Sequence, residues 1–279
     1  MEHVMAAMRQ PLPALTDLTL QFSDETQSPP IIYSVIPDSF LGESATTCLR
    51  SLRLINIPFP LPALRKLLLS AADLVKIRIW RIPNSWYISP EEMVVTCLST
   101  LTRLQEFELG FQSRDNWGNR RLPPETCTRF VLPALTSLQF KGVYEYMEDL
   151  MARIDAPQLD NLKIILFYQP VLDAPQLAQF ISRTPRFKAL NKLHVLFDGR
   201  GVFVLFPWTL HRGLQVRVLP GPPNPFSILV ELCGSSFLRT LIPIVKHLHI
   251  LEYGSTLSYW RESIESSHWL RPFSAVKEL

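Results

Sequence analysis

Two pairs of residues have the type and spacing to do chemistry. His247 and His249 alternate in "VKHLHI", so on a β-strand both imidazoles would point to one side and could share a metal ion. Glu106 and Glu108 alternate in the same way and could act as an acid pair. Neither pair has a further ligand or partner at a suitable spacing. We therefore interpret both pairs as solvent-facing residues of strands.

Two other stretches suggest chemistry but lack an essential part of the motif. "GESA" at 42–45 resembles a nucleophile elbow without its final glycine, and we interpret it as a loop. "WGNRR" at 117–121 joins basic residues to an aromatic one, as nucleic-acid-binding segments do, and we interpret it as a solvated loop. Phosphate-binding, dinucleotide-binding and zinc-finger motifs are absent from the sequence. We expect no catalytic residue, no metal site and no cofactor.

Composition narrows the class of protein. The chain has 279 residues, of which 47% are hydrophobic, so it can bury a large core, and its net charge of +3 does not favour nucleic acid or an acidic membrane as a partner. Its four cysteines are far apart, and no secretory leader opens the sequence. "GVFVLFPWTL" at 201–210 is shorter than the roughly 18–20 residues that span a membrane. We expect an intracellular protein, cytoplasmic or nuclear, that binds neither membrane nor nucleic acid.

The elements that would position these residues follow a repeat. The pattern apolar-x-x-apolar-x-apolar recurs at intervals of 24 to 34 residues, and each copy predicts a short strand with one apolar face. A weaker copy is "LQVRV" at 214–218. The clear copies are Leu15-Leu18-Leu20, Leu49-Leu52-Leu54, Leu74-Ile77-Ile79, Leu104-Phe107-Leu109, Leu135-Leu138-Phe140, Leu159-Leu162-Ile164, Leu190-Leu193-Val195 and Val245-Leu248-Ile250.

Helices are expected between the strands. "SPEEMVVTCLSTL" begins with a capping box of Ser89 and Glu92, and "DAPQLAQFIS" begins with Asp173 as its cap. "NPFSILVELC" begins with Asn224, and "YEYMEDLMARI" places its apolar residues on one face. The motif "LPAL" occurs three times, but the copy at 61–64 opens a run of good helix formers only ten residues before another strand. That copy predicts a helix instead of a strand.

Alternating strands and helices favour an α/β repeat, a leucine-rich-repeat-like solenoid. Its parallel strands would line the concave side, and helices or irregular segments would line the convex side. We expect residues 1–279 to form one such domain, incomplete at both ends. The alternative is a closed, doubly wound α/β domain. It is less favoured because the strands place polar residues between apolar ones, which predicts one solvated sheet face.

That polar face is the candidate binding surface. Arg and Trp carry interface energy more often than other residue types, so Arg53, Arg78 and Trp80 are the expected anchors. A merely solvated sheet face would look the same in the sequence. The full set of candidate partner-binding residues is Arg53, Lys76, Arg78, Trp80, Glu106, Glu108, Gln139 and Lys163.

Several long phrases resemble a known family. "IPDSFLGESATTCLRSLRLINIPFP", "ADLVKIRIWRIPNSWYISPEEMVVTCLSTLTRLQEFELGFQS", "RFVLPALTSLQFKGVYEYMEDLMARIDAPQLDNLKI" and "DAPQLAQFISRTPRFKAL" resemble F-box proteins with divergent leucine-rich repeats from mushroom-forming fungi. The resemblance implies a target-binding repeat region that an F-box links to the Skp-type adaptor of a ubiquitin ligase. A repeat strand already begins at Leu15, which leaves no room for an F-box.

The sequence therefore predicts a non-enzymatic protein-binding domain. We expect it to be the substrate-recognition part of an F-box-type ubiquitin-ligase receptor, with an unknown target protein. A Skp-type adaptor would be a partner only if a longer form carries an F-box. The alternatives are an α/β hydrolase or transferase and a fragment without a function of its own.

Overall fold

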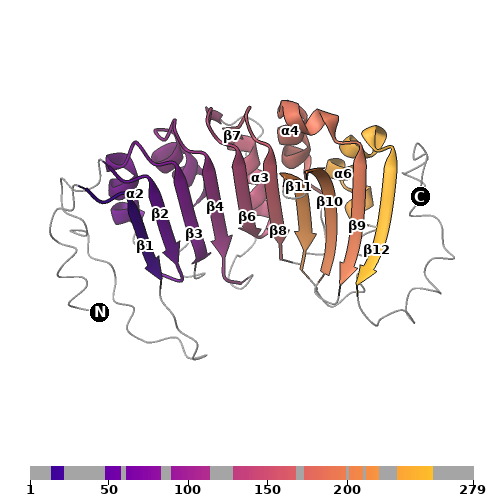
Figure 1. Ribbon diagram of the computed structural model, residues 1–279, viewed down its shortest axis with the longest axis horizontal. Helices are drawn as coiled ribbons and strands as arrows, with labels where there is room; N and C mark the ends of the chain where they lie inside the picture. Colours follow the sequence, from indigo (N-terminus) through magenta and orange to yellow (C-terminus); the bar gives the residue numbers. More distant parts are fainter. Residues whose placement is uncertain are drawn as a thin grey trace, which may run out of the picture.

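The computed structural model describes residues 14–21, 48–57, 61–82, 89–113, 128–167, 173–198, 201–209, 212–219 and 231–253. The predicted sites at 42–45, 117–121 and Asn224 lie outside these ranges. Ten strands form one long sheet, which Figure 1 shows face-on. In chain order its strands are β1 (Asp17–Gln21), β2 (Ser51–Ile55), β3 (Lys76–Ile82), β4 (Glu106–Phe111), β6 (Ser137–Gly142), β8 (Asn161–Leu166), β9 (Lys192–Asp198), β10 (Gly201–Thr209), β11 (Arg212–Val218) and β12 (His247–Tyr253).

Helices and short helical turns form a second layer, and α3 lies behind β6 and β8 in Figure 1. A separate two-stranded sheet joins β5 (Phe130–Val131) to β7 (Ile154–Asp155). The helical elements are α2 (Leu61–Ser70), the π-helical η1 (Glu92–Leu98), α3 (Tyr144–Arg153), α4 (Pro175–Arg183), the 3-10 turn η2 (Pro185–Ala189), α6 (Ser236–Leu241) and the 3-10 turn η3 (Ile242–Ile244).

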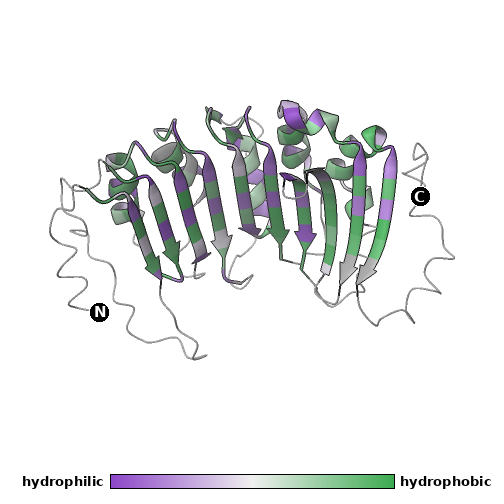
Figure 2. Ribbon diagram, in the orientation of Figure 1, coloured by the Kyte–Doolittle hydropathy of each residue, from purple (hydrophilic) through white to green (hydrophobic). Residues whose placement is uncertain are grey.

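The strand predictions are confirmed wherever the structure describes the chain. Every apolar triplet in the sequence marks a strand or the turn that leads into it, and its last two residues alternate along that strand. Most side chains at these alternate positions are buried, and Leu52, Leu138 and Leu162 are at most 1% exposed, whereas Ile250 of β12 is 37% exposed. Figure 2 shows the resulting bands of hydrophobic and hydrophilic residues along the strands.

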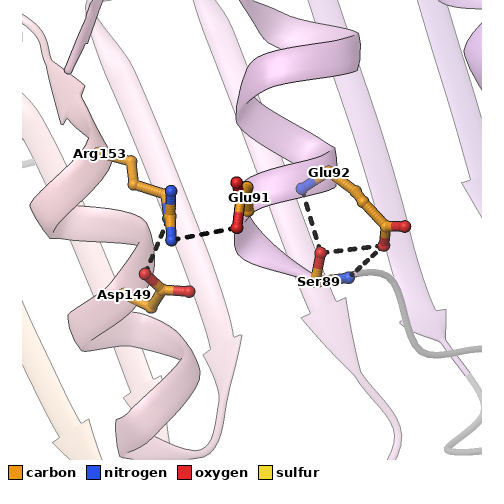
Figure 3. A network of polar contacts seen from close by, with 5 residues as sticks. All are labelled: Ser89, Glu91, Glu92, Asp149 and Arg153. Atoms are coloured by element: carbon orange, nitrogen blue, oxygen red, sulfur yellow. Dashed lines mark hydrogen bonds and ion pairs between the residues drawn. The ribbon is translucent and has the colours of Figure 1, made fainter. Parts of the chain in front are cut away.

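The helix predictions are confirmed in part. The third "LPAL" opens α2, as predicted, and the Ser89–Glu92 capping box forms. The Ser89 Oγ accepts the Glu92 N–H at 3.1 Å, while a Glu92 carboxylate oxygen accepts the Ser89 N–H at 3.2 Å. Figure 3 shows this box and the neighbouring contact from Glu91 to Arg153 of α3, which in turn pairs with Asp149. Adjacent helices are thereby joined at their polar ends.

An aromatic cluster fills the middle of the interface between sheet and helices. The Phe140 ring stacks on Tyr146 of α3 at 5.6 Å between centroids and meets Phe111 edge-on at 6.3 Å. The rings approach the backbone of Gly142 so closely that a Cβ there would lie 2.6 Å from the Phe140 ring. Glycine at this position therefore lets the cluster pack against the end of β6.

The prediction of a leucine-rich-repeat-like solenoid is wrong. In a solenoid each strand lies parallel to the strand of the preceding repeat. The sheet instead has the order β1-β2-β3-β4-β6-β8-β11-β10-β9-β12. β10 pairs antiparallel with both β9 and β11, and β11 and β10 separate β9 from β8. The fold is a mixed, mostly parallel sheet with helices packed on one face.

A buried carboxylate marks the point where the strand order changes. Asp160, immediately before β8, has a side chain that is 7% exposed and forms ion pairs with two arginines. Its Oδ2 lies 2.6 Å from Arg212 at the start of β11 and 2.9 Å from Arg186 of η2. By accepting from both arginines through this one oxygen, the carboxylate joins β8, β11 and the turn before β9.

Candidate functional site

The candidate residues lie on the sheet face opposite the buried one, which we call the open face. The candidate residues on this face are half-buried or exposed and alternate with buried strand neighbours, although Ile55 and Ile165 of the same face are buried. The parallel register places them in straight rows across the strands. The middle row runs Arg53, Arg78, Glu108, Gln139 and Lys163, and the row beside it runs Ser51, Lys76, Glu106, Ser137 and Asn161. The structure thus brings together all the predicted candidates except Trp80, which lies one row further along β3.

Salt bridges between neighbouring strands neutralise part of this face. Lys76 contacts Glu106 at 2.8 Å, and Arg78 contacts Glu108 at 3.0 Å. The two glutamates are therefore ion-pair partners of β3 and do not form an acid pair with each other. Because these side chains are substantially exposed, each pair is expected to contribute at most about 1 kcal/mol to stability. Their main effect is to restrain these side chains on the open face.

Trp80 is held flat against the sheet by its surroundings. Its ring covers Gly110 of β4 so closely that a Cβ on that glycine would lie 2.5 Å from a ring carbon. The Arg78 guanidinium lies 5.5 Å from the ring centroid, within cation–π range. Both predicted anchors on β3 are therefore held in place by neighbouring side chains or backbone.

A third row, which the sequence did not single out, combines cations with aromatic rings. Lys141 is in register with Ile165, which is in register with Arg217, and Arg217 is opposite Phe203. The Arg217 guanidinium lies 4.2 Å from the Phe203 ring centroid. The polar–apolar alternation of "LQVRV" places Arg217 on one side of its strand. The repeat pattern does not predict strand β10, so the sequence does not show which ring Arg217 contacts.

Of the two histidines that alternate in the sequence, His247 and His249, the second lies beside a histidine of another strand. His249 of β12 lies beside His194 of β9, with ring centroids 4.7 Å apart, because the two positions are in register. Burial, His249 and Lys192 together lower the pKa of His194. Among the described residues, no group of three or more His, Cys, Asp or Glu side chains could hold a metal ion.

On the helix side, Glu148 is the one strongly perturbed carboxylate that the described residues contain, and its role there is structural. Its carboxylate accepts the N–H of Gln176 at 2.8 Å and of Leu177 at 2.9 Å, which caps the start of α4. Burial outweighs these two hydrogen bonds and raises the pKa of Glu148 to about 7. The prediction that Asp173 caps this helix is wrong. Its carboxylate accepts the N–H and the hydroxyl of Ser236, at 2.9 and 2.6 Å, at the start of α6.

Comparisons with family models, curated proteins and solved structures find no match. None of the helices in the described part of the chain is long and apolar enough to cross a membrane. The open face itself is therefore the basis for a functional proposal.

Proposed function

We propose that this protein binds a protein partner through its open face and catalyses no reaction. The observation that carries the proposal is the alignment of polar and aromatic side chains in rows across β2, β3, β4, β6 and β8. No described helix covers these rows, because the helices pack on the opposite face. A sheet face of this kind presents many side chains at fixed spacings to an extended or folded partner.

The side chains of this face are largely ordered in advance. Immobilising a flexible side chain on binding costs about 0.5–1.5 kcal/mol, so restraint in the free protein favours affinity. Arg78 is restrained by both Glu108 and Trp80. Arg53 and Lys163, at either end of the middle row, have no ion-pair partner among the described residues. We propose that these two cations meet the partner directly.

We extend the proposal to the pathway that the sequence resemblance implies. The chain would recognise the target of an F-box-type ubiquitin ligase, and an F-box in a longer form would contact the Skp-type adaptor. The buried free thiols of Cys97 and Cys233 agree with a reducing compartment, the cytoplasm or the nucleus. Genomic sequence encoding an in-frame F-box before Met1 would support the extension, and an intergenic region there would contradict it.

Reversing one charge on each face tests the binding proposal. A displayed peptide library would be selected against the full chain, and the enriched clones measured against Lys163→Glu and Arg65→Glu. Lys163 lies on the open face and Arg65 is exposed on α2, so the chemical change is nearly the same on opposite sides of the molecule. We expect Lys163→Glu to weaken the enriched clones by tenfold or more, about 1.4 kcal/mol, and Arg65→Glu to change them less than twofold.

The selection can also contradict the proposal. Clones that lose affinity for Arg65→Glu and keep it for Lys163→Glu would place binding on the helix side. Failure to enrich any clone, with both variants folded by circular dichroism, would remove the support for a protein-binding face.

A further inference from the structure

Three cations gather near the carboxyl ends of the parallel strands on the open face. The pKa of Lys141 is lowered by its partial burial and by the positive charges of Arg81 and Arg217. Arg81 lies at the end of β3, Lys141 on β6 and Arg217 on β11, so three separate strands contribute. We call these residues, with Trp80, Phe167 and Phe203, the cationic patch.

Carboxylates of the described residues do not neutralise Arg81 and Lys141. The glutamates of β4 pair with Lys76 and Arg78, which lie two rows and one row away, respectively. Among the described residues, no carboxylate forms an ion pair with Arg81 or Lys141. The fold therefore holds like charges together where solvent screening is reduced, which opposes folding.

The backbone is also distorted at this place. Arg81 has a φ of 58°, and the β3–β4 register shifts between Ile79 and Ile82, as at a β-bulge. A residue with a side chain in this left-handed region costs of order 1–3 kcal/mol. Bulges redirect side chains, and this one lies where Trp80 covers Gly110 and where Arg81 acts on Lys141. Strain and charge repulsion at one place point to a binding role.

Two aromatic rings of the patch, Phe167 and Phe203, pack against its cations. The Lys141 ammonium lies 5.4 Å from the Phe167 ring centroid, and the Arg217 guanidinium 4.2 Å from that of Phe203. The Phe167 side chain belongs to a residue only 8% exposed. Single-stranded nucleic acid binds by stacking its bases on open aromatic rings. The patch offers held positive charge instead, which favours carboxylates of a peptide.

We infer that the cationic patch binds an acidic segment of a protein partner, with Asp or Glu side chains contacting Lys141 and Arg217. The inference rests on the proposed function, since it specifies the charge of what the open face binds. Lys141 and Arg217 are both in register with Ile165, so they are two strands apart, roughly 10 Å at the usual inter-strand spacing. An extended peptide covers that distance in about three residues. Carboxylates two or three residues apart can therefore reach both cations.

Binding of defined peptides to the full chain tests this inference. The probe is a fluorescein-labelled peptide of 12 residues with Glu at alternate positions, and its control has Gln in place of every Glu. Fluorescence anisotropy should show the Glu peptide binding at least tenfold more tightly, with the difference shrinking as salt is raised. Lys141→Gln should weaken the Glu peptide about fivefold or more. Lys192→Gln, at an exposed lysine of β9 in the same sheet, should change it less than twofold.

Four results would overturn the inference. The Gln peptide could bind as tightly as the Glu peptide, or both lysine variants could lose the same affinity. A 12-nucleotide single-stranded RNA could bind more tightly than the Glu peptide and depend on Lys141, which would make the patch a nucleic-acid site. If the clones from the peptide library need Lys163 but carry no acidic residues, the proposed function stands and the inference alone fails. Circular dichroism of each variant distinguishes loss of binding from loss of folding. The Arg217→Lys variant, which keeps the positive charge, serves as a further control.

Discussion

Replacing Glu148 by alanine should lower the free energy of unfolding by about 3 kcal/mol at pH 7. The substitution leaves the N–H groups of Gln176 and Leu177 without the acceptor that caps α4, and Leu177 is 1% exposed, so water does not easily replace it. Each unsatisfied buried donor costs about 1–3 kcal/mol. Reversible urea denaturation followed by circular dichroism measures the difference. Glu106→Ala is the control, and since Glu106 is an exposed salt-bridge partner we expect less than about 1 kcal/mol.

The same carboxyl group should make stability depend on pH. The pKa of Glu148 in the folded protein is about 7, above its ordinary value of 4.5. Between these two values the folded protein holds a proton that the unfolded chain has released. The free energy of unfolding should therefore fall as pH rises from 4.5 to 7, and then become insensitive to this group. Glu148→Gln should remove this part of the pH dependence, whereas an unchanged slope in the variant would assign it to other groups.

Replacing Phe140 by alanine should lower the free energy of unfolding by about 3–5 kcal/mol. Phe140 is fully buried and contacts both Phe111 of the sheet and Tyr146 of α3. The ring joins the two layers, and the aromatic neighbours cannot collapse fully into the space that it leaves. Urea denaturation again gives the magnitude.

Two variants show whether that loss comes from the aromatic cluster. Phe140→Leu keeps most of the buried volume and should cost less than half as much as the alanine variant. Val131→Ala removes methyl groups from a residue that is 57% exposed, so we expect a change within about 0.5 kcal/mol. Equal losses for the alanine and leucine variants would mean that the ring contacts with Tyr146 and Phe111, and not the buried volume, account for the loss.

The strands and their buried residues could be predicted from the sequence because both depend on local alternation. Leu52, Phe107 and Leu162 were expected on the buried face, and each is at most 1% exposed. Helix α2 was likewise distinguished from a strand by its helix-forming residues and by its distance from the next apolar triplet. The same alternation predicted which residues of a single strand share the open face, such as Lys76 and Arg78 on β3 or Glu106 and Glu108 on β4.

The order of the strands could not be predicted in this way. The alternation of side chains has the same period in parallel and antiparallel strands. The sequence of β9 therefore does not indicate that β10, the next strand in the chain, pairs with it antiparallel. The apolar run of β10 was considered only as a membrane span, and it was too short for one. The cationic patch was missed for the same reason, since Arg217 meets Phe203 only through the antiparallel pairing of β10 and β11.

Asp173 shows a different limit of prediction. Its position before "APQL" is the usual place for a helix cap, but a carboxylate from α3 already occupies the start of α4. Asp173 instead accepts two hydrogen bonds from Ser236, 63 positions later. Local sequence identifies which residues can cap a helix, whereas the choice between two competing carboxylates depends on how the helices pack.

The placement of β11 and β10 between β8 and β9 also has a consequence for the folding of the chain. In the first part of the sheet each strand docks on the one made just before it, as when Asn161 of β8 reaches Ser137 of β6, 24 positions earlier. On its other side β8 acquires its neighbour only when β11 arrives, and the Asp160–Arg212 contact at that junction closes a loop of 52 positions. Longer loop closure carries a larger entropy cost, and high contact order slows folding. Until β11 pairs with it, this edge of β8 has unpaired backbone groups, and β9, which has the same apolar spacing, is a competing strand for that edge.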